Sequence, residues 1–586
     1  MKIFGKHAAS LPMLFLLTMC PFHKGFAAQM NAIVPVGILR PATDAQGRVI
    51  QATTPEGKAY PVFRPAEDFP FIQRVRGVLE TSFAQQVVRL DRYARNLLLR
   101  EPGRAGEQRL TEPMYLLLST EEGGFARYGF WLEDQRGGRR LVLAGYVDLV
   151  VGEEGIATGG LEEIFCHELG HLILRSLLGD IGSGPSRKMH QSMTVTDYPT
   201  AFDEGYAEHF QPLVRDATGN AYLRELSKGA TATDLNLLWL SRLDQQLRTD
   251  GVKRNLFIHR KALPALALQP EPDRYQLFLD SETSVDFLSD ELKNAQEMMA
   301  CEGVIATLFY RLVNDDRLRN QYREPGFYQQ FLAPEVSSQG HSRESGNPLA
   351  KPSECGLAGM DSRFHGNDGA DIKKVFPPYE NINLKLFAAM RSVAAESADA
   401  HKPLIIEIVN AYARLFPDEA EEIYGVFLKT TRGVTATQEL ATAFEGAATA
   451  GRRGDMEAFR QPSLAAFSLL RTTTDQVAQG KLGLGANLGP ELWVLNSSFK
   501  IAPAVWEHDR TLPLTLNLNT AAEAELMTLP GVDLAIAQRV VAARRARGFF
   551  RSLEELRAKA GLSPALSKSL VEMSAQMMTQ KEYKRE

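Results

Sequence analysis

The chain has 586 residues, a formal net charge of −5 at pH 7, and 44% hydrophobic and 23% charged residues. These values are typical of soluble globular domains, and they exclude a collagen-like fibre, a wholly disordered chain and a polytopic membrane protein. At about 150 residues per domain the length favours about four units. The four cysteines are too few for a disulfide-built scaffold.

The first residues have the order of a secretory signal peptide. Two lysines within the first six residues precede an apolar run over 11–20, and Gly-Phe-Ala-Ala follows at 25–28. This run is too short to cross a bilayer, which takes about 20 residues. We therefore expect residues 1–28 to be a signal peptide and the protein to be exported to the periplasm, without a transmembrane span. Cys20 follows a Met and fits a lipoprotein box poorly, so lipid anchoring is not expected.

The sequence has strand patterns between residues 114 and 151 and mostly helical patterns from residue 160. Three segments rich in β-branched and aromatic residues, with glycines between them, predict strands over 114–119, 128–132 and 141–151. From residue 160 the apolar spacing is mostly helical, and it continues over 383–460. Residues 473–512 are rich in Gly, Pro and Asn and lose this periodicity, which indicates an irregular connector.

One internal stretch differs from its surroundings. Residues 336–371 hold many Gly, Ser, Asn and Asp residues and almost no apolar periodicity. Their two arms, HSRESGNP and DSRFHGNDG, resemble a translated intergenic repeat that occurs in many bacterial genomes. So few apolar side chains cannot offset the chain entropy lost on folding, so we expect a disordered insertion. Its His341, His365 and Cys355 are then not metal ligands.

The strongest chemical signal is the segment LEEIFCHELGHLILRSLLG at 161–179. Acidic residues at its start and Gly179 at its end predict a helix. His167 and His171 are four residues apart, so a helix places both imidazoles on one face, where they can reach one zinc ion. Glu168 lies at the edge of that face, where it can take a proton from water activated by the metal.

A catalytic zinc needs a third protein ligand, and the segment TAFDEGYAEHFQP at 200–212 offers one. Its Asp-Glu-Gly-Tyr-Ala run resembles the second zinc helix of the gluzincin metallopeptidases, in which the Glu of an (N/D)-E-G-(F/Y)-A run is the ligand. The resemblance implies that Glu204 completes a Zn²⁺ site, and that Glu168 is the general base in peptide-bond hydrolysis. Glu208, one turn further on, could hold a ligating histidine in orientation. His209 remains an alternative third ligand.

The resemblance is firm over 110–215 and loose beyond. The segment 172–203 between the second histidine and the glutamate is longer than in well-known gluzincins. The aminopeptidase signature G-A-M-E-N is also absent, so endo- and exopeptidase both stay open. An oxyanion stabiliser is expected, with Tyr310 and His190 as candidates. Cys166 is expected to pack in the core, because its side chain points about 100° round the helix from the neighbouring histidine.

The C-terminal region carries a second signal. Its sequence over 516–556 resembles the helix-hairpin-helix modules of exported competence DNA receptors, in which a Gly-hydrophobic-Gly hairpin offers backbone N–H groups to a DNA phosphate. The resemblance and the basic cluster beside the hairpin give the candidate DNA-binding residues Gly531, Val532, Arg539, Arg544 and Arg545. Asp533 replaces the second hairpin glycine, where a carboxylate repels phosphate and a side chain hinders close approach of the backbone. DNA binding and a packing or scaffold role therefore both stay open.

Together these patterns predict an α+β fold, in which a mainly helical multidomain protein has a small sheet before the zinc helix and an all-α helix-hairpin-helix domain at its end. The expected order is a signal peptide at 1–28, a gluzincin-like core at 29–335, the insertion at 336–371, a helical extension at 372–472, the connector at 473–512 and the helix-hairpin-helix domain at 513–586. The predicted function is zinc-dependent hydrolysis of a peptide or protein substrate. The alternative is an envelope DNA-binding or scaffold protein whose zinc site is structural or decayed.

Overall fold

The computed structural model describes residues 33–226, 251–259, 292–333, 369–395, 402–452, 456–500 and 513–579, with Thr249 and without positions 105, 120–122, 183 and 187–189. The predicted signal peptide at 1–28 and nearly all of the predicted insertion at 336–371 lie outside these residues. Among the helices that are described, none is long and apolar enough to cross a membrane.

A small mixed sheet precedes the helix that carries the HELGH run, as predicted. Its strands are β1 (Val36–Pro41), β2 (Gln51–Thr53), β3 (Ala59–Pro65), β4 (Met114–Leu118), β5 (Gly124–Glu133) and β6 (Arg139–Leu149). The last three confirm the strands expected between 114 and 151, whereas the first three are additional to the prediction. β1 and β3 are short and each contains Pro, so their alternating pattern is weak in the sequence.

The sheet closes on itself. The strand order is β1-β4-β6-β5-β3-β2, and β1 also pairs antiparallel with β3, so five strands form a ring. All five contribute to one buried cluster, which includes Leu39, Phe63, Tyr115, Phe130 and Val142. Strands β5 and β6 also contact the helix α6 (Gly160–Leu178). The sheet is therefore the support against which α6 packs.

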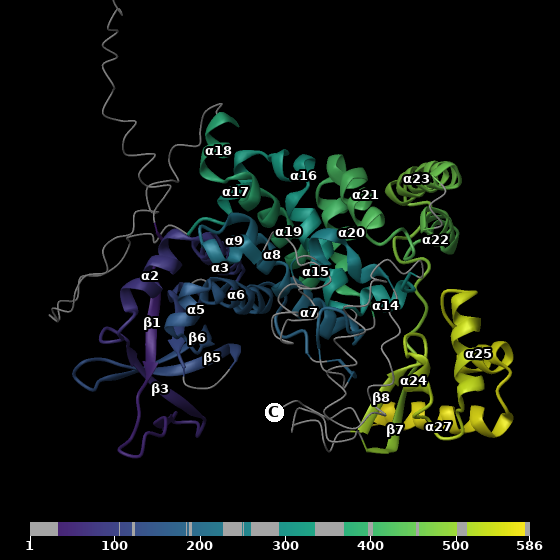
Figure 1. The fold of residues 1–586 in the computed structure, drawn as a ribbon. Coiled ribbons are helices and arrows are strands. Elements are labelled where there is room, and N and C mark those ends of the chain that lie inside the picture. The colour runs from purple at the N-terminus through teal and green to yellow at the C-terminus, as the bar shows by residue number, and fades with distance from the viewer. Residues whose placement is uncertain are drawn as a thin grey trace, which may run out of the picture. The chain divides into compact units, whose positions relative to one another are not determined.

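Helices make up most of the remaining structure (Figure 1). The first set is α2 (Ile72–Thr81), α3 (Phe83–Leu99), α4 (Gln108–Thr111), α5 (Glu153–Ala157), α6, α7 (Tyr198–Glu208), α8 (Phe210–Ala217), α9 (Ala221–Leu226), α12 (Val252–Arg254), η2 (Leu256–Ile258), α14 (Ala295–Met299), α15 (Glu302–Asn314), α16 (Asp316–Asn320) and α17 (Pro325–Gln329). The predicted helical extension is α18 (Gly369–Val375), α19 (Pro378–Ala395), α20 (Leu404–Leu415), η5 (Pro417–Glu419), α21 (Ala420–Thr430), α22 (Gln438–Arg452) and α23 (Met456–Ala478). Its boundaries differ slightly from the prediction, because α18 begins inside 336–371 and α23 continues past 472.

Helix α6, which carries the HELGH run, is buried over most of its surface. It packs against α3, α7, α8 and α19 as well as the sheet. Its buried residues include apolar side chains and also Glu162, Glu163 and His167, so burial is not confined to one apolar face. The helix begins after Gly159 and ends at Gly179, both with positive φ, so the predicted stop is confirmed. The HELGH run therefore lies in the middle of a rigid, enclosed helix.

The C-terminal region contains a feature that the sequence analysis missed. Strand β7 (Trp493–Lys500) pairs antiparallel with β8 (Pro513–Asn517). Residues 493–500 of the predicted irregular connector are thus regular, because Val494 and Leu495 are buried in a short apolar run. Strand β8 also begins the domain that was expected to be all-α. The helices α24 (Glu523–Leu526), α25 (Leu534–Arg545), α26 (Leu553–Ala560) and α27 (Pro564–Thr579) follow, and they share one core with β7 and β8.

Candidate metal centre and C-terminal module

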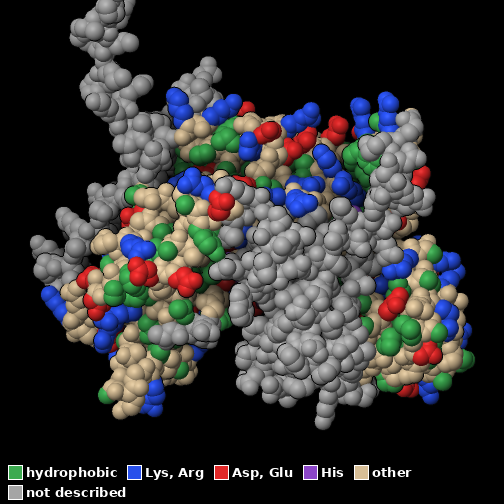
Figure 2. All heavy atoms as spheres, viewed as in Figure 1, with side chains coloured by type: hydrophobic (Ala, Val, Ile, Leu, Met, Phe, Trp, Pro, Cys, Tyr) green, Lys and Arg blue, Asp and Glu red, His purple; other side chains and the backbone are tan. Residues whose placement is uncertain are grey.

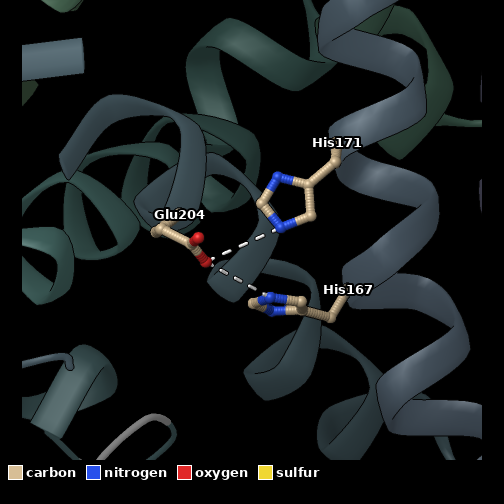
Figure 3. A group of neighbouring side chains, drawn as sticks. All are labelled: His167, His171 and Glu204. Carbon is tan, nitrogen blue, oxygen red and sulfur yellow. Dashed lines mark ion pairs between the residues drawn. The ribbon is translucent and has the colours of Figure 1, made fainter. Parts of the chain in front are cut away.

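The three predicted zinc ligands meet in one place (Figure 3). His167 and His171 project from the same side of α6, and Glu204 reaches them from α7. Oε2 of Glu204 lies 3.7 Å from Nε2 of His167 and 3.6 Å from Nε2 of His171. Ligand atoms about 2.1 Å from a tetrahedral zinc are about 3.4 Å apart. The spacing of these three donor atoms therefore suits one such ion, and the residues form a group that could hold a metal.

Two glycines let the supporting helices come close enough for this arrangement. Gly170, inside the HELGH run, lies against α7, where a Cβ atom on it would be 2.9 Å from Cα of Ala207. Gly205 lies against α15, where a Cβ atom would be 2.6 Å from the carbonyl oxygen of Glu302. Backbone atoms at these distances cannot give way to a larger residue without moving a helix. The glycines of both motifs thus set the distance between Glu204 and the histidines.

Asp203 orients one of the two histidines. Its Oδ1 lies 2.9 Å from Nδ1 of His171. When His171 donates its Nδ1–H to this carboxylate, Nε2 keeps a lone pair that faces Glu204. Burial lowers the pKa of His171, but the charges of Asp203 and Glu204 outweigh burial and raise this pKa to about 10. The protonated ring is therefore a cation between two carboxylates. A divalent metal ion at Nε2 could take the place of the proton on that nitrogen.

Glu168, the predicted general base, lies beside this group. The residue is 8% exposed, and its charge contributes to the raised pKa of His171. Oε1 of Glu168 faces Gly124 at the start of β5. A Cβ atom at position 124 would lie 2.8 Å from this oxygen and 2.8 Å from Cγ2 of Ile164. Gly124 therefore leaves the space that the Glu168 carboxylate occupies.

His190, one of the two oxyanion candidates, lies next to the other oxygen of Glu204. Its Nε2 is 3.5 Å from Oε1 of Glu204, and its Nδ1 is 3.4 Å from Oε2 of Glu302. Burial raises the pKa of Glu204, but the surrounding imidazoles, His190 first among them, outweigh it and hold this pKa well below its usual range. Glu204 is therefore ionised and can serve as a ligand at neutral pH.

His209, the alternative third ligand, does not lie with the donor groups of the metal centre. Its ring packs against Tyr206, Phe210 and Phe309, and burial lowers its pKa to about 3. The imidazole is therefore neutral and belongs to the aromatic core. Cys166 is also fully buried, as expected for a core residue, and burial raises the pKa of its thiol.

Two other candidate residues take part in hydrogen bonds. Glu208 accepts a hydrogen bond from the hydroxyl of Ser192 at 2.9 Å, and Asp203 is a carboxylate that lies beside a predicted ligating histidine, His171. Tyr310 donates its hydroxyl to Asp216 at 2.8 Å. This hydrogen bond ties the Tyr310 hydroxyl to a carboxylate that belongs to neither donor group of the centre.

The sequence analysis missed three residues of the centre. Asp203 carried a signal, because it fills the first position of the (N/D)-E-G-(F/Y)-A run. Glu302 and Gly124 carried none, because α15 and β5 come to the site only through packing. Their roles depend on contacts between segments that are far apart in the chain.

The C-terminal unit consists of two helix pairs, each with a glycine turn. Gly531 lies between α24 and α25 with φ +80°, and Gly561 lies between α26 and α27 with φ +62°. Both values lie in the left-handed region, which favours glycine. Residues 514–572 match the family model of the helix-hairpin-helix motif. The predicted helix-hairpin-helix module is thereby confirmed over these residues.

No curated protein and no solved structure matches the chain. The helix-hairpin-helix match lies wholly within the C-terminal region, so it carries no information about the metal centre. The gluzincin resemblance over 110–215 therefore stays a prediction that rests on the motifs and on the geometry of the donor atoms.

The hairpin of the helix-hairpin-helix module is exposed at Gly531, and Val532 packs partly against the module's core. The following residue, Asp533, caps α25, because its carboxylate accepts a hydrogen bond from the backbone N–H of Ile536 at 2.8 Å. That N–H is one of those at the helix N-terminus which could otherwise face a phosphate. The Asp533 carboxylate therefore already binds one of the backbone N–H groups that could be offered to a phosphate at the first hairpin.

The predicted basic cluster divides into two kinds of arginine. Arg544 is 1% exposed and donates hydrogen bonds to the carbonyl oxygens of Ala521, at 2.8 Å, and Leu518, at 3.2 Å. Its assignment to DNA binding is wrong, because the guanidinium is buried, with Glu297 of α14 at 3.5 Å, and so lies out of reach of a phosphate. Arg539 and Arg545 are exposed. Basic and acidic side chains are intermixed on the face of the module that Figure 2 shows.

Proposed function

We propose that this protein is an exported metal-dependent hydrolase that cleaves peptide bonds, with zinc as the metal. The observation that carries the proposal is the convergence of His167, His171 and Glu204 on one point, with Glu168 beside them. A donor set of two imidazoles and one carboxylate is that of catalytic zinc, which leaves a position open for water or substrate. A purely structural zinc site uses four protein ligands and has no need of a general base such as Glu168.

The chain's own residues supply the acid–base chemistry. The bound metal would polarise the scissile carbonyl and make water acidic enough to react near neutral pH. Glu168 would accept the proton of the attacking water and then deliver it to the departing amine, which balances the hydrolysis. Asp203 keeps the His171 ring in the tautomer that binds cations. Burial of the group strengthens each of these electrostatic interactions relative to water.

The proposal is tested by metal analysis of the purified full chain and by peptide-library cleavage with and without a chelator. We expect bound zinc, and cleavage that the chelator abolishes and added zinc restores. Glu204→Ala should lose the zinc, whereas His209→Ala should keep it. Retention of zinc in Glu204→Ala with loss in His209→Ala would assign the third ligand to His209. A chain that binds no metal and cleaves no peptide refutes the proposal.

Export is part of this proposal, since residues 1–28 have the order of a signal peptide. N-terminal sequencing of the protein recovered from the periplasmic fraction tests it. A mature chain that begins near residue 29 supports export, and an intact Met1 on a cytoplasmic chain contradicts it.

The helix-hairpin-helix match supports a second candidate function, binding of DNA through its phosphates. The exposed Gly531 hairpin and Arg545 favour it, whereas the Asp533 carboxylate opposes it. We expect weak binding without base preference that falls steeply with salt, because backbone contacts release counterions. Titration of the full chain with fluorescent duplex DNA at low and high salt tests this. A chain that binds no duplex at low salt would leave the module a scaffold.

A further inference from the structure

Both oxygens of the Glu204 carboxylate lie near histidine nitrogens. Its Oε2 faces Nε2 of His167 and His171, at 3.7 and 3.6 Å. Its Oε1 faces Nε2 of His190, at 3.5 Å. One zinc ion needs only one of these oxygens. A carboxylate with nitrogen donors at both oxygens has the arrangement of a bridge between two metal ions.

The donors on the second side form a group of their own. One ligand atom each from His190, Glu204 and Glu302 lies within 4.8 Å of the others. His190 belongs to the loop before α7, and its side chain is 40% exposed, which gives an ion access from solvent. Glu302 is the first residue of α15, and its side chain is 1% exposed. This second group is therefore open on the histidine side and enclosed on the Glu302 side.

The packing of α7 on α15 sets the place of Glu302. Gly205 directly follows Glu204 in the chain, and it lies against the carbonyl oxygen of Glu302, where a Cβ atom would approach to 2.6 Å. The backbones of the two helices therefore touch at the residue next to Glu204. The same contact that sets Glu204 opposite His167 brings the Glu302 carboxylate to the far side of Glu204.

The charges of the site favour a second cation. Two carboxylates, those of Glu204 and Glu302, flank the imidazole of His190, and their side chains are 17% and 1% exposed. Enclosed like charges raise the free energy of the folded chain unless cations accompany them. Two-metal hydrolytic sites hold their ions about 3.5–4 Å apart, a distance that one carboxylate can bridge.

We propose that the centre is dinuclear. The first ion is held by His167, His171 and Oε2 of Glu204, and the second by Oε1 of Glu204, His190 and Glu302. Nitrogen and carboxylate donors suit Zn²⁺, Mn²⁺ or Co²⁺ at the second position. The inference rests on the proposed first metal site, and it assigns His190 and Glu302 as ligands rather than as substrate-binding groups.

Metal counting on the purified full chain tests the proposal directly. The metal-free chain is saturated with Zn²⁺, freed of loose ion by gel filtration and analysed by mass spectrometry. We expect two ions per chain, one after His190→Ala or Glu302→Gln, and fewer than one after Glu204→Ala, because both ions lose a ligand. Glu162→Gln is the matched control. Glu162 is also a buried glutamate of this region, on α6, but it accepts hydrogen bonds from the backbone N–H of Phe83 and the hydroxyl of Thr218.

A spectroscopic measurement tests the bridge. The chain loaded with Mn²⁺ should give the electron paramagnetic resonance signal of an exchange-coupled pair, and His190→Ala should give that of an isolated ion. Two uncoupled ions would refute the bridge by Glu204. A wild-type chain that saturates at one ion, which His167→Ala removes, would refute the second site and leave the proposed function intact. No bound ion at all would refute both.

Discussion

Oδ1 of Asp203 lies 2.9 Å from Nδ1 of His171, while the next residue, Glu204, places Oε2 3.6 Å from Nε2 of the same ring. Two consecutive carboxylates of α7 thus hold one imidazole of α6 from both nitrogens. Such an arrangement fixes the orientation of the histidine ring before a metal arrives. The geometry leads to a first prediction about metal affinity.

Asp203→Ala should weaken zinc binding about 10- to 100-fold, because loss of the orienting carboxylate frees the ring and lowers its basicity. Competition with a zinc-binding dye measures this. Asp216→Ala is the control, because Asp216 is also a carboxylate of this region but contacts Tyr310 and Lys253 instead. Equal zinc affinities in Asp203→Ala and the wild type would show that Asp203 does not tune the ligand.

Glu168→Gln should keep zinc content unchanged and lower kcat for peptide cleavage about 10²- to 10⁴-fold, the usual contribution of a general base. The amide has the size of the carboxylate but cannot accept the proton at neutral pH. Zinc analysis and steady-state cleavage of the best library peptide measure the two effects. Unchanged turnover would rule out Glu168 as the base.

Gly124→Ala should lower turnover while the chain stays folded, because the new Cβ would stand 2.8 Å from Oε1 of Glu168 and displace that carboxylate. We expect a loss of about 10-fold or more, since misplacement of a catalytic group by about 1 Å can cost about 10²-fold. Gly219→Ala is the control, because a Cβ atom there meets nothing within 4 Å. Full activity of Gly124→Ala would mean that Glu168 has room to move.

His209 should make the protein acid-sensitive. Its pKa is lowered to about 3 by burial, so between pH 6.5 and 3 the unfolded chain takes up a proton that the folded chain refuses. Stability is therefore lost as pH falls below about 6.5. His209→Phe should reduce the loss of unfolding free energy between pH 7 and 5 by about 2 kcal/mol, at about 1.4 kcal/mol per pKa unit. Urea unfolding at the two pH values measures it, and equal losses in both proteins would contradict it.

The two neighbouring arginines of the helix-hairpin-helix module should behave differently. Arg544→Met should lower the free energy of unfolding by about 2–4 kcal/mol, because it leaves buried carbonyl oxygens without their donor. Arg545→Met should change stability by less than about 0.5 kcal/mol, as expected for an exposed residue. If the module binds DNA, Arg545→Met should weaken binding and Asp533→Gly should tighten it. Thermal melts and duplex titrations give both readouts.

The sequence by itself determined the parts of this protein that depend on local spacing. The i, i+4 separation of His167 and His171 places both rings on one side of any helix, whatever surrounds it. The strands near 114–151 and the Gly531 turn likewise depend on sequence patterns that are only a few residues long. These features were predicted because the periods of helices and strands act over short stretches of chain.

The tertiary structure alone decided which residues meet and which are enclosed. Glu302 lies near Glu204 because α7 packs on α15 at Gly205, a contact between segments that are far apart in the chain. Arg544 has the same side chain as Arg545, but the fold encloses one and exposes the other. Burial and long-range contacts depend on how distant segments pack together. A local sequence pattern contains only one of the two residues in such a contact, so it cannot predict the contact.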